Sequence, residues 1–181
     1  DYLAAVPHVD GQATKKVAGI VMNANPFTNG HRYLVEQAAK ENDLVYVFVV
    51  NTDLSLFNTS ERFELVKAGT ADLKNVIVVD GGDYMVSYAT FPAYFLESAD
   101  QTIRYQTTLD ARVFRDKIAP ALNIKTRYVG SEPLSRTTGI YNQVLQQELL
   151  PKVALKIIDR KTATNGNYIT ATEVRKCIKD D

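Results

Sequence analysis

The stretch VAGIVMNANPFTNGHRYLVEQAAK, Val17 to Lys40, decides the fold that this sequence predicts. It opens with six apolar residues, the length of a buried strand. It closes with a segment in which apolar and charged residues recur with the period of an amphipathic helix. The two parts are joined by a short turn that contains polar residues and a glycine. A strand, a turn and a helix in this order are the beginning of an α/β unit.

Four further apolar segments follow along the chain: LVYVFVV (44–50), VIVV (76–79), TRYV (126–129) and VALKII (153–158). The segments 17–22 and 44–50 are continuously apolar rather than alternating, which is typical of a parallel sheet covered by helices on both faces. Helical patterns lie between the segments. The alternation predicts a doubly wound, Rossmann-like α/β fold, with five parallel strands and right-handed crossovers.

Three of the helical patterns have recognisable ends. We expect Ser60 to cap the segment ERFELVKAG and Gly69 to end it. The segments TLDARVFRDKIAPAL and TTGIYNQVLQQELLP form two more helices, and Pro151 stops the second. The region 80–106 is long and rich in aromatic residues, and we expect it to be an elaboration after the third strand.

Length, charge and cysteine content narrow the class of protein. The 181 residues suit one domain, and no apolar run approaches the roughly 20 residues that would span a bilayer. Basic and acidic residues number 21 each, so no overall field attracts nucleic acid or a membrane surface. The single cysteine, Cys177, favours a reducing compartment and therefore the cytoplasm.

The N-terminal segment differs from the rest. Residues 1–15 lack the apolar core of a secretory signal, and we interpret them as a tail or linker that leads into a domain over residues 16–181. The start at Asp1 rather than Met suggests a piece of a longer protein.

The turn after the first strand has the chemistry of an anion site. Gly30 suits a sharp change of direction and a close approach of the backbone to a ligand. His31 falls in the first helical turn, beside unpaired N–H groups and the positive end of the helix dipole. Thr28 and Asn25 add neutral donors. The alternative is an ordinary turn with an exposed histidine, because short motifs have many false positives.

A second segment, NYITATEVRKCI (167–178), follows the fifth strand. Thr170 or Thr172 can cap a helix there, and both can help to hold a phosphate. Arg175 in its early turns provides a forked cation suited to phosphate oxygens. The alternative is a plain capped C-terminal helix.

A third segment, RYVGSEP (127–133), places Gly130, Ser131 and Glu132 after the fourth strand, where main-chain groups can meet a base or ribose. The three segments follow the first, fourth and fifth strands, which can be neighbours around one crevice. Arg160 and Lys161, directly after the fifth strand, either reach phosphates or form an exposed pair. Arg62 either faces the crevice or pairs with a neighbouring glutamate.

The motif Thr-x-Gly-His, at Thr28, Gly30 and His31, and the motif Ile-Thr-Ala-Thr-x-Val-Arg, at 169–175, resemble the paired motifs of the HxGH nucleotidyltransferase superfamily. Three longer strings are similar to the catalytic domain of the citrate lyase ligase family: VMNANPFTNGHRYLVEQAA, LKNVIVVDGGDYMVSYATFPAYFL and YVGSEPLSRTTGIYNQVL. The likeness runs from about Lys16 to the end. Family members usually carry another domain before this one. Its absence from this sequence agrees with a chain that starts at Asp1.

This resemblance implies activation of acetate by ATP as acetyl adenylate, with release of pyrophosphate. The acetyl group then passes to the thiol of the phosphoribosyl dephospho-coenzyme A group on the acyl carrier subunit of citrate lyase. Mg²⁺ would bridge phosphates, held mostly by substrate oxygens and water rather than by a protein metal site.

Carried onto this chain, the resemblance assigns charge stabilisation on the α and β phosphates to His31, assisted by Thr28. It assigns the departing pyrophosphate to Thr170, Thr172 and Arg175. Gly130, Ser131 and Glu132 would line the nucleotide side. Where the superfamily often has Phe-Asp-Pro, this chain has Ala24-Asn25-Pro26, which leaves the role of Asn25 open.

Two alternatives remain at this point. The string TNGH also occurs in pantetheine-phosphate adenylyltransferases of similar size, although the approach MNANPF and the aromatic region argue against that class. The other alternative is a nucleotide-binding module that keeps the fold without catalysis.

Overall fold

The structure is a computed structural model that describes residues 1–181 except 52–54, 86–98, 132, 134, 165 and 181. Five strands form one sheet in the order β3-β2-β1-β4-β5, and every adjacent pair is parallel. The strands are β1 (Val17–Met22), β2 (Leu44–Val49), β3 (Val76–Asp80), β4 (Ile124–Gly130) and β5 (Ala154–Ile158). The predicted doubly wound parallel sheet is confirmed, and the first, fourth and fifth strands are neighbours as expected.

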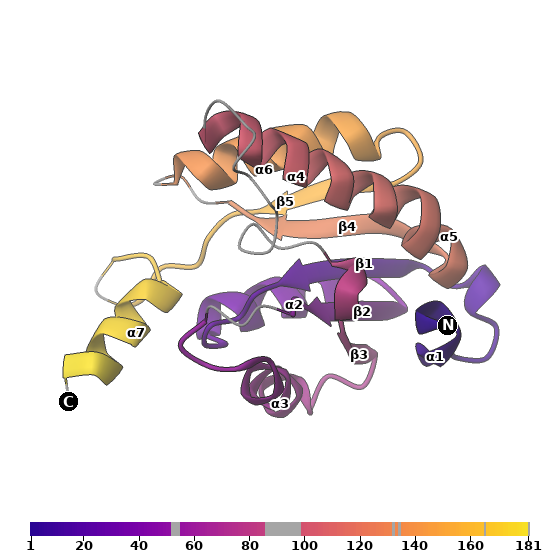
Figure 1. Cartoon of the computed structure of the whole chain (residues 1–181). Coiled ribbons are helices and arrows are strands. Elements are labelled where there is room, and N and C mark those ends of the chain that lie inside the picture. The colour runs from indigo at the N-terminus through magenta and orange to yellow at the C-terminus, as the bar shows by residue number, and fades with distance from the viewer. Residues whose placement is uncertain (52–54, 86–98, 132, 134, 165, 181) are drawn as a thin grey trace.

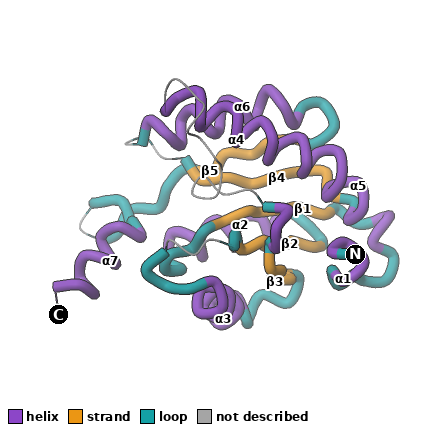
Figure 2. The backbone as a smooth tube through the Cα atoms, in the orientation of Figure 1, coloured by secondary structure: helices purple, strands orange, loops and turns teal. Residues whose placement is uncertain are grey.

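Helices cover both faces of the sheet (Figures 1 and 2). The helices α2 and α3 lie on one face, while α4, α5 and α6 lie on the other. The α-helices are α1 (Tyr2–Ala5), α2 (Asn29–Glu41), α3 (Thr59–Thr70), α4 (Ala99–Val113), α5 (Ala119–Leu122), α6 (Arg136–Leu149) and α7 (Ala171–Asp180). The described residues also include two short 3₁₀ helices, Gln12–Thr14 and Gly82–Tyr84, and a π-helical turn, Phe114–Ile118. No helix among the described residues is long and apolar enough to cross a membrane.

Two large apolar clusters, one on each side of the sheet, make up most of the core, and a third, small cluster of Ile103, Ile140 and Val144 joins α4 to α6. Side chains alternate along a strand between the two faces. In β2, Val45, Val47 and Val49 pack under α2 and α3, while Tyr46 and Phe48 pack under α4 and α5. This strand is buried along its whole length, which explains why its sequence is continuously apolar.

Residues 1–15, predicted to be a tail or linker, are packed against the sheet domain. Val6 belongs to the core cluster under α4 and α5. The buried Gln12 side chain donates to Leu122 O (2.7 Å), and the Tyr46 hydroxyl donates to Pro7 O. The segment therefore has fixed contacts, while the boundary at residue 16 stays a prediction.

The start and end of α3 differ from the prediction. Asn58, not Ser60, is the N-cap: Asn58 Oδ1 accepts from Glu61 N (2.9 Å), and Glu61 Oε2 accepts from Asn58 N (2.9 Å). This reciprocal capping box needs a glutamate three residues after the cap, and only Asn58 has one at that spacing. Gly69 does not end the helix, which continues to Thr70.

A buried charged cluster ties α4 and α6 to β4. Arg127 is fully buried, and its Nη2 donates to Asp110 Oδ2 (3.2 Å) and to the Tyr141 hydroxyl (2.6 Å). Its guanidinium also stacks over the Phe114 ring, 4.8 Å from the centroid. Residues 86–98 of the aromatic region 80–106, with four of its six aromatic side chains, lie outside the described residues. Of its described tyrosines, Tyr84 is half exposed and stacks on Tyr2.

Candidate functional site

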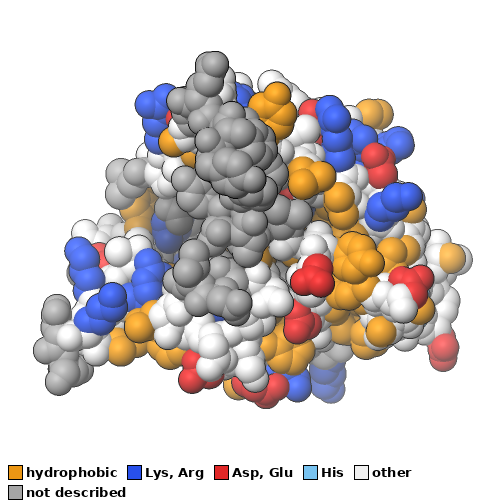
Figure 3. Space-filling model, viewed as in Figure 1, with side chains coloured by type: hydrophobic (Ala, Val, Ile, Leu, Met, Phe, Trp, Pro, Cys, Tyr) orange, Lys and Arg blue, Asp and Glu red, His pale blue; other side chains and the backbone are white. Residues whose placement is uncertain are grey.

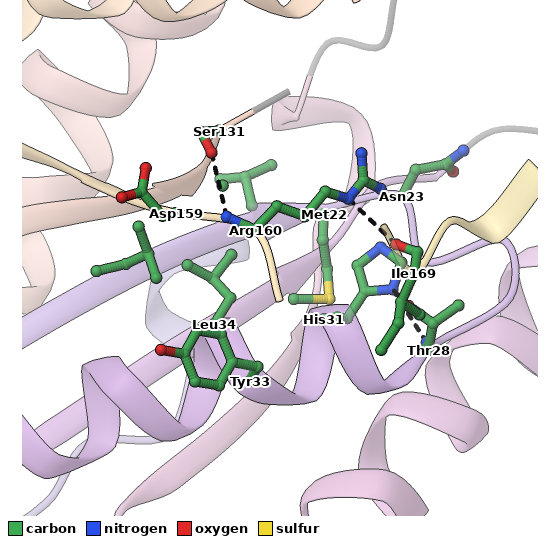
Figure 4. Close-up of a pocket in the computed structure, with 14 residues that line it drawn as sticks. Met22, Asn23, Thr28, His31, Tyr33, Leu34, Ser131, Asp159, Arg160 and Ile169 are labelled. Atoms are coloured by element: carbon green, nitrogen blue, oxygen red, sulfur yellow. Dashed lines mark hydrogen bonds between the residues drawn. The ribbon is translucent and has the colours of Figure 1, made fainter. Parts of the chain in front are cut away.

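A cavity of about 240 Å³ opens where β1, β4 and β5 end, at the point where the strand order reverses (Figure 4). Ligands of doubly wound folds bind at this position. It is lined by Val21, Met22, Asn23, Thr28, Gly30, His31, Tyr33, Leu34, Gly130, Ser131, Ile158, Asp159, Arg160 and Ile169. Pockets for drug-sized ligands typically measure about 300 Å³ or more. A bound nucleotide would therefore extend beyond the cavity.

Five of the predicted site residues line this cavity: Thr28, Gly30, His31, Gly130 and Ser131. The expectation that the turn after β1 and the loop after β4 face one crevice is thus met by the structure. A Cβ atom at Gly30 would lie 3.5 Å from Ile169 O, in ordinary contact, so packing does not require glycine there.

Four other predicted residues lie beside the cavity rather than in its wall. Arg175 Nη1 donates to Asn25 O (2.6 Å), and Arg175 Nη2 donates to Thr172 Oγ1 (3.0 Å). Thr170 caps α7, since its Oγ1 accepts from Glu173 N (3.1 Å). The second predicted segment therefore meets the loop after β1 through Arg175. Glu132 lies outside the described residues.

The His31 ring is oriented by the residue that caps α2. Its Nδ1 accepts the backbone N–H of Thr28 (3.0 Å) and lies 2.9 Å from Thr28 Oγ1. An imidazole nitrogen that accepts an N–H carries no proton. The ring proton of neutral His31 is therefore on Nε2. Histidine at the third helical position here performs the capping role that glutamate or glutamine has in other helices.

The surroundings of His31 favour this neutral form. Burial, and secondarily the positive charge of Arg160, lowers the pKa of His31 to about 4. At neutral pH the ring is thus an uncharged donor, with one N–H fixed in direction by Thr28.

A pH series tests this protonation state. An unfolded histidine titrates near about 6.5, so between about pH 6.5 and pH 4 the unfolded chain binds more protons at this residue than the folded chain. We expect the free energy of unfolding to fall as the pH is lowered through this window. The His31→Gln variant keeps an N3 side chain that can cap Thr28, and its loss should be smaller. Equal pH dependence of the two proteins would contradict the assignment.

The His31 ring is packed by Phe27, whose own position depends on Gly69. The rings of Phe27 and His31 stack with centroids 5.7 Å apart. A Cβ atom at Gly69 would lie 2.4 Å from Phe27 Cε1, which is closer than two carbon atoms can approach. Gly69 on α3 therefore leaves the space that the Phe27 ring occupies.

This contact predicts an unusual effect of Gly69→Ala. Alanine in a helix is ordinarily about 1 kcal/mol better than glycine. Here we expect a loss of stability instead, because the Phe27 ring must move. Gly139→Ala in α6 is the matched control, since a Cβ atom there meets nothing within 4 Å and should stabilise the protein. Denaturant unfolding measures both. A gain in both variants would show that Phe27 gives way without cost.

Sequence reasoning left Arg160 open and gave no role to Asp159 or Asn23. All three line the cavity. The backbone N–H of Arg160 donates to Ser131 Oγ (3.2 Å), and its Nε donates to Ile169 O (3.1 Å), so the side chain crosses the cavity towards His31 (Figure 4). Their place in the sequence could have indicated this role, because each of the three follows the end of β1 or β5.

Arg62 lies beneath the surface of the site and contacts the residues that follow β1 and β2. It is fully buried, rather than facing the crevice. Its guanidinium donates to Asn23 O (2.7 Å), Val50 O (2.9 Å) and Phe57 O (3.1 Å). It thereby fixes the chain where β1 and β2 end. A buried arginine is exceptional, so nothing in the sequence pointed to this role.

Comparison with known proteins gives a consistent result. Residues 17–181 match the family described as the citrate lyase ligase C-terminal domain. A [citrate [pro-3S]-lyase] ligase from Escherichia coli strain K12 is 47% identical over 168 residues, which are 90% of this chain and 48% of that protein. The chain spans about half the length of the curated relatives that it matches.

Solved structures share the fold. Pantothenate synthetase from Thermus thermophilus superposes with a TM-score of 0.59 at 17% identity, covering 96% of this chain and 64% of that one. A protein described as a nicotinate-nucleotide adenylyltransferase, from Vibrio parahaemolyticus, gives a TM-score of 0.50 at 18% identity, covering 92% and 82%. At these identities the likeness concerns the fold alone, and it confirms the nucleotidyltransferase-like architecture.

Proposed function

Because this chain belongs to the citrate lyase ligase C-terminal domain family, we propose that it activates acetate with ATP and forms acetyl adenylate and pyrophosphate. The acetyl group then passes to the prosthetic-group thiol of the acyl carrier subunit of citrate lyase. One observation carries the proposal: a neutral His31 presents its Nε2 proton at the cavity, at the start of α2. A cytoplasmic location belongs to the same proposal and agrees with the single, exposed Cys177.

The first chemical step joins acetate to the nucleotide. An acetate oxygen attacks the α phosphorus of ATP, and the bond from that phosphorus to the bridging oxygen of the β phosphate breaks. The bond electrons leave with pyrophosphate. No protein nucleophile is needed, so catalysis consists of positioning and charge stabilisation. In this mechanism the Nε2–H of His31 donates a hydrogen bond to a phosphate oxygen as negative charge increases there, and Thr28 keeps the ring in that orientation.

The remaining predicted residues divide between the two ends of the nucleotide. Gly130, Ser131 and Glu132 would line the nucleoside end. The residues at the start of α7, Thr170, Thr172 and Arg175, would hold the departing pyrophosphate. Because Arg175 donates to Asn25 O, binding phosphate would exchange this carbonyl for a phosphate oxygen. Asn25 thus meets Arg175 through its backbone, while its side-chain Oδ1 accepts from Phe57 N (3.1 Å).

Charge at the mouth of the cavity suits a triphosphate. Lys and Arg side chains lie over the α7 end of the face in Figure 3, where α7 carries Arg175, Lys176 and Lys179 against Glu173 and Asp180, a net charge of +1 from three basic and two acidic residues. Arg160 adds a cation in the cavity wall. The net charge of the chain is zero, so this concentration is local. Local positive potential raises the concentration of an anionic substrate near its site.

Mg²⁺ fits the site as a companion of the substrate. Among the described residues, no three His, Cys, Asp or Glu side chains come together as a metal-binding group. Asp159 lines the cavity, and its carboxylate would be the protein ligand of such an ion. Mg²⁺ at nucleotide sites usually keeps one or two carboxylates, phosphate oxygens and water. When bound, the ion would neutralise phosphate charge.

The exchange of labelled pyrophosphate into ATP tests the proposal. Acetate-dependent exchange supports acyl adenylate formation. Exchange that requires phosphopantetheine instead would assign the chain to adenylyl transfer of the pantetheine-phosphate type. If ATP binds but neither acid nor phosphopantetheine supports exchange, the proposal fails for this chain and a nucleotide-binding module is the better description.

A further inference from the structure

Asn23 is the first residue after β1, and its side chain is exposed in the cavity wall. Figure 4 shows it on the same side of the cavity as the guanidinium of Arg160 and the His31 ring. Neither of the paired motifs includes this residue. Its position in the wall of the same cavity as His31 and Arg160 nevertheless calls for a physical explanation.

The buried Arg62 fixes which way the Asn23 amide points. Arg62 Nη1 donates to Asn23 Oδ1 at 3.1 Å, as well as to the Asn23 carbonyl at 2.7 Å. A guanidinium has only donors, so the amide atom that faces it must be the oxygen. Rotation of the amide by half a turn would set two donors against each other. The Nδ2 group therefore points away from Arg62.

The outward Nδ2 group has two N–H donors to offer. Within the described part of the chain, no residue accepts a hydrogen bond from it. An exposed amide can use water, but this one is held in direction by a fully buried charge. A side chain fixed in this way loses little conformational entropy when a ligand binds. These are the properties of a preformed subsite for an anionic or carbonyl oxygen.

The position of Asn23 separates this subsite from the nucleoside end. Ser131 and Asp159 follow β4 and β5, on one side of β1. Through Arg62, Asn23 is tied to Val50, which follows β2 on the other side of β1. A nucleoside bound beside β4 and β5 therefore leaves the Asn23 side for the second reactant.

We propose that Asn23 Nδ2 binds the carboxylate of the small acid substrate, so that Asn23 and Arg62 form the acid subsite. This inference rests on the proposed function. One carboxylate oxygen accepts from Nδ2 while the other attacks the α phosphorus. A neutral amide orients the acid without pairing with its negative charge, which the nucleophile must keep. Arg62 is a positioning residue, because it acts through Asn23.

Two substitutions at Asn23 separate this role from a structural one. Asn23→Asp keeps an oxygen for Arg62 and replaces the donor with a second oxygen. Asn23→Leu removes the amide with little change of shape, and Arg62 Nη1 still donates to the backbone carbonyls of residues 23 and 50. Asn29→Leu is the matched control, because Asn29 lies close by at the start of α2, is exposed and does not line the cavity.

The experiment measures acetate and ATP separately in the 181-residue chain. The KM for acetate in pyrophosphate exchange should rise roughly 10- to 100-fold in both Asn23 variants, as expected for a lost hydrogen bond to a charged group. The Kd for ATP should change less than about threefold in Asn23→Leu, because the triphosphate has other partners. The control should match the parent chain. Line broadening of ¹³C-labelled acetate with a non-hydrolysable ATP analogue reports acid binding without turnover.

The outcomes distinguish the two proposals. An unchanged KM for acetate, or an equal loss for acetate and ATP in Asn23→Leu, overturns the acid subsite while leaving the proposed function intact. If the parent chain shows no exchange but binds acetate in a way that the Asn23 variants abolish, the subsite stands and the proposed function fails. Acetate binding that is absent, or that is the same in all variants, overturns the subsite.

Discussion

Replacing His31 with alanine should lower the rate of acetate-dependent pyrophosphate exchange by about 10²- to 10³-fold, the loss typical of one transition-state hydrogen-bond donor. The affinity for ATP should fall much less, by under about tenfold. The reason lies in the fixed Nε2 proton. It meets a phosphate oxygen whose negative charge increases as the acid attacks, so the hydrogen bond strengthens between the bound state and the transition state.

The matched control for this change is His8→Ala. His8 is the other histidine of the chain, and its Nδ1 lies 2.8 Å from Val6 O and its Nε2 3.4 Å from Ala121 O, away from the cavity. ATP affinity is measured by calorimetry and the exchange rate at saturating ATP. Equal losses of rate and affinity in His31→Ala would mean that the ring binds ATP without favouring the transition state.

Replacing Arg62 with alanine should have the largest effect on stability, lowering the free energy of unfolding by about 3–5 kcal/mol. The substitution leaves a cavity and removes the donors to the carbonyls of Asn23, Val50 and Phe57. The contact to the Val50 carbonyl is buried, and a buried carbonyl left without a partner costs about 1–3 kcal/mol, while the two part-buried carbonyls add less. Because these carbonyls hold the ends of β1 and β2, exchange activity should also fall.

The control is Arg112→Ala. Arg112 is 59% exposed and pairs with Glu148 at 3.0 Å. Exposed ion pairs contribute about 0–1 kcal/mol, so this variant should unfold almost like the parent chain. Denaturant unfolding compares the two directly. If Arg62→Ala loses no more stability than Arg112→Ala, the buried guanidinium does not hold the strand ends.

The sequence predicted the architecture well because each strand is marked by a local feature. Continuous apolar runs such as 44–49 indicate a strand covered on both faces, and the structure buries every residue of this run. The turn at Thr28 to His31 combines a cap, a glycine and a ring in four residues, so its place at a helix start also follows from local rules.

The features that the sequence missed depend on contacts between distant segments. The start of α3 is an intermediate case: Asn58, Thr59 and Ser60 are all good caps, and only the spacing to Glu61 selects Asn58. Gly69 had the look of a helix end, whereas it makes room for Phe27 from another loop. The direction of the Asn23 amide depends on Arg62, 39 positions away. No local rule predicts such a pair.

The most direct test of the central claim follows an oxygen atom. The chain is incubated with ATP, a thiol acceptor and acetate labelled with ¹⁸O in both carboxylate oxygens, and the AMP is analysed by ³¹P NMR. Attack of acetate on the α phosphorus, followed by transfer of the acetyl group to the thiol, predicts one ¹⁸O atom in AMP and unlabelled pyrophosphate. Label in inorganic phosphate, with ADP as the other product, would contradict this mechanism, as would AMP free of label.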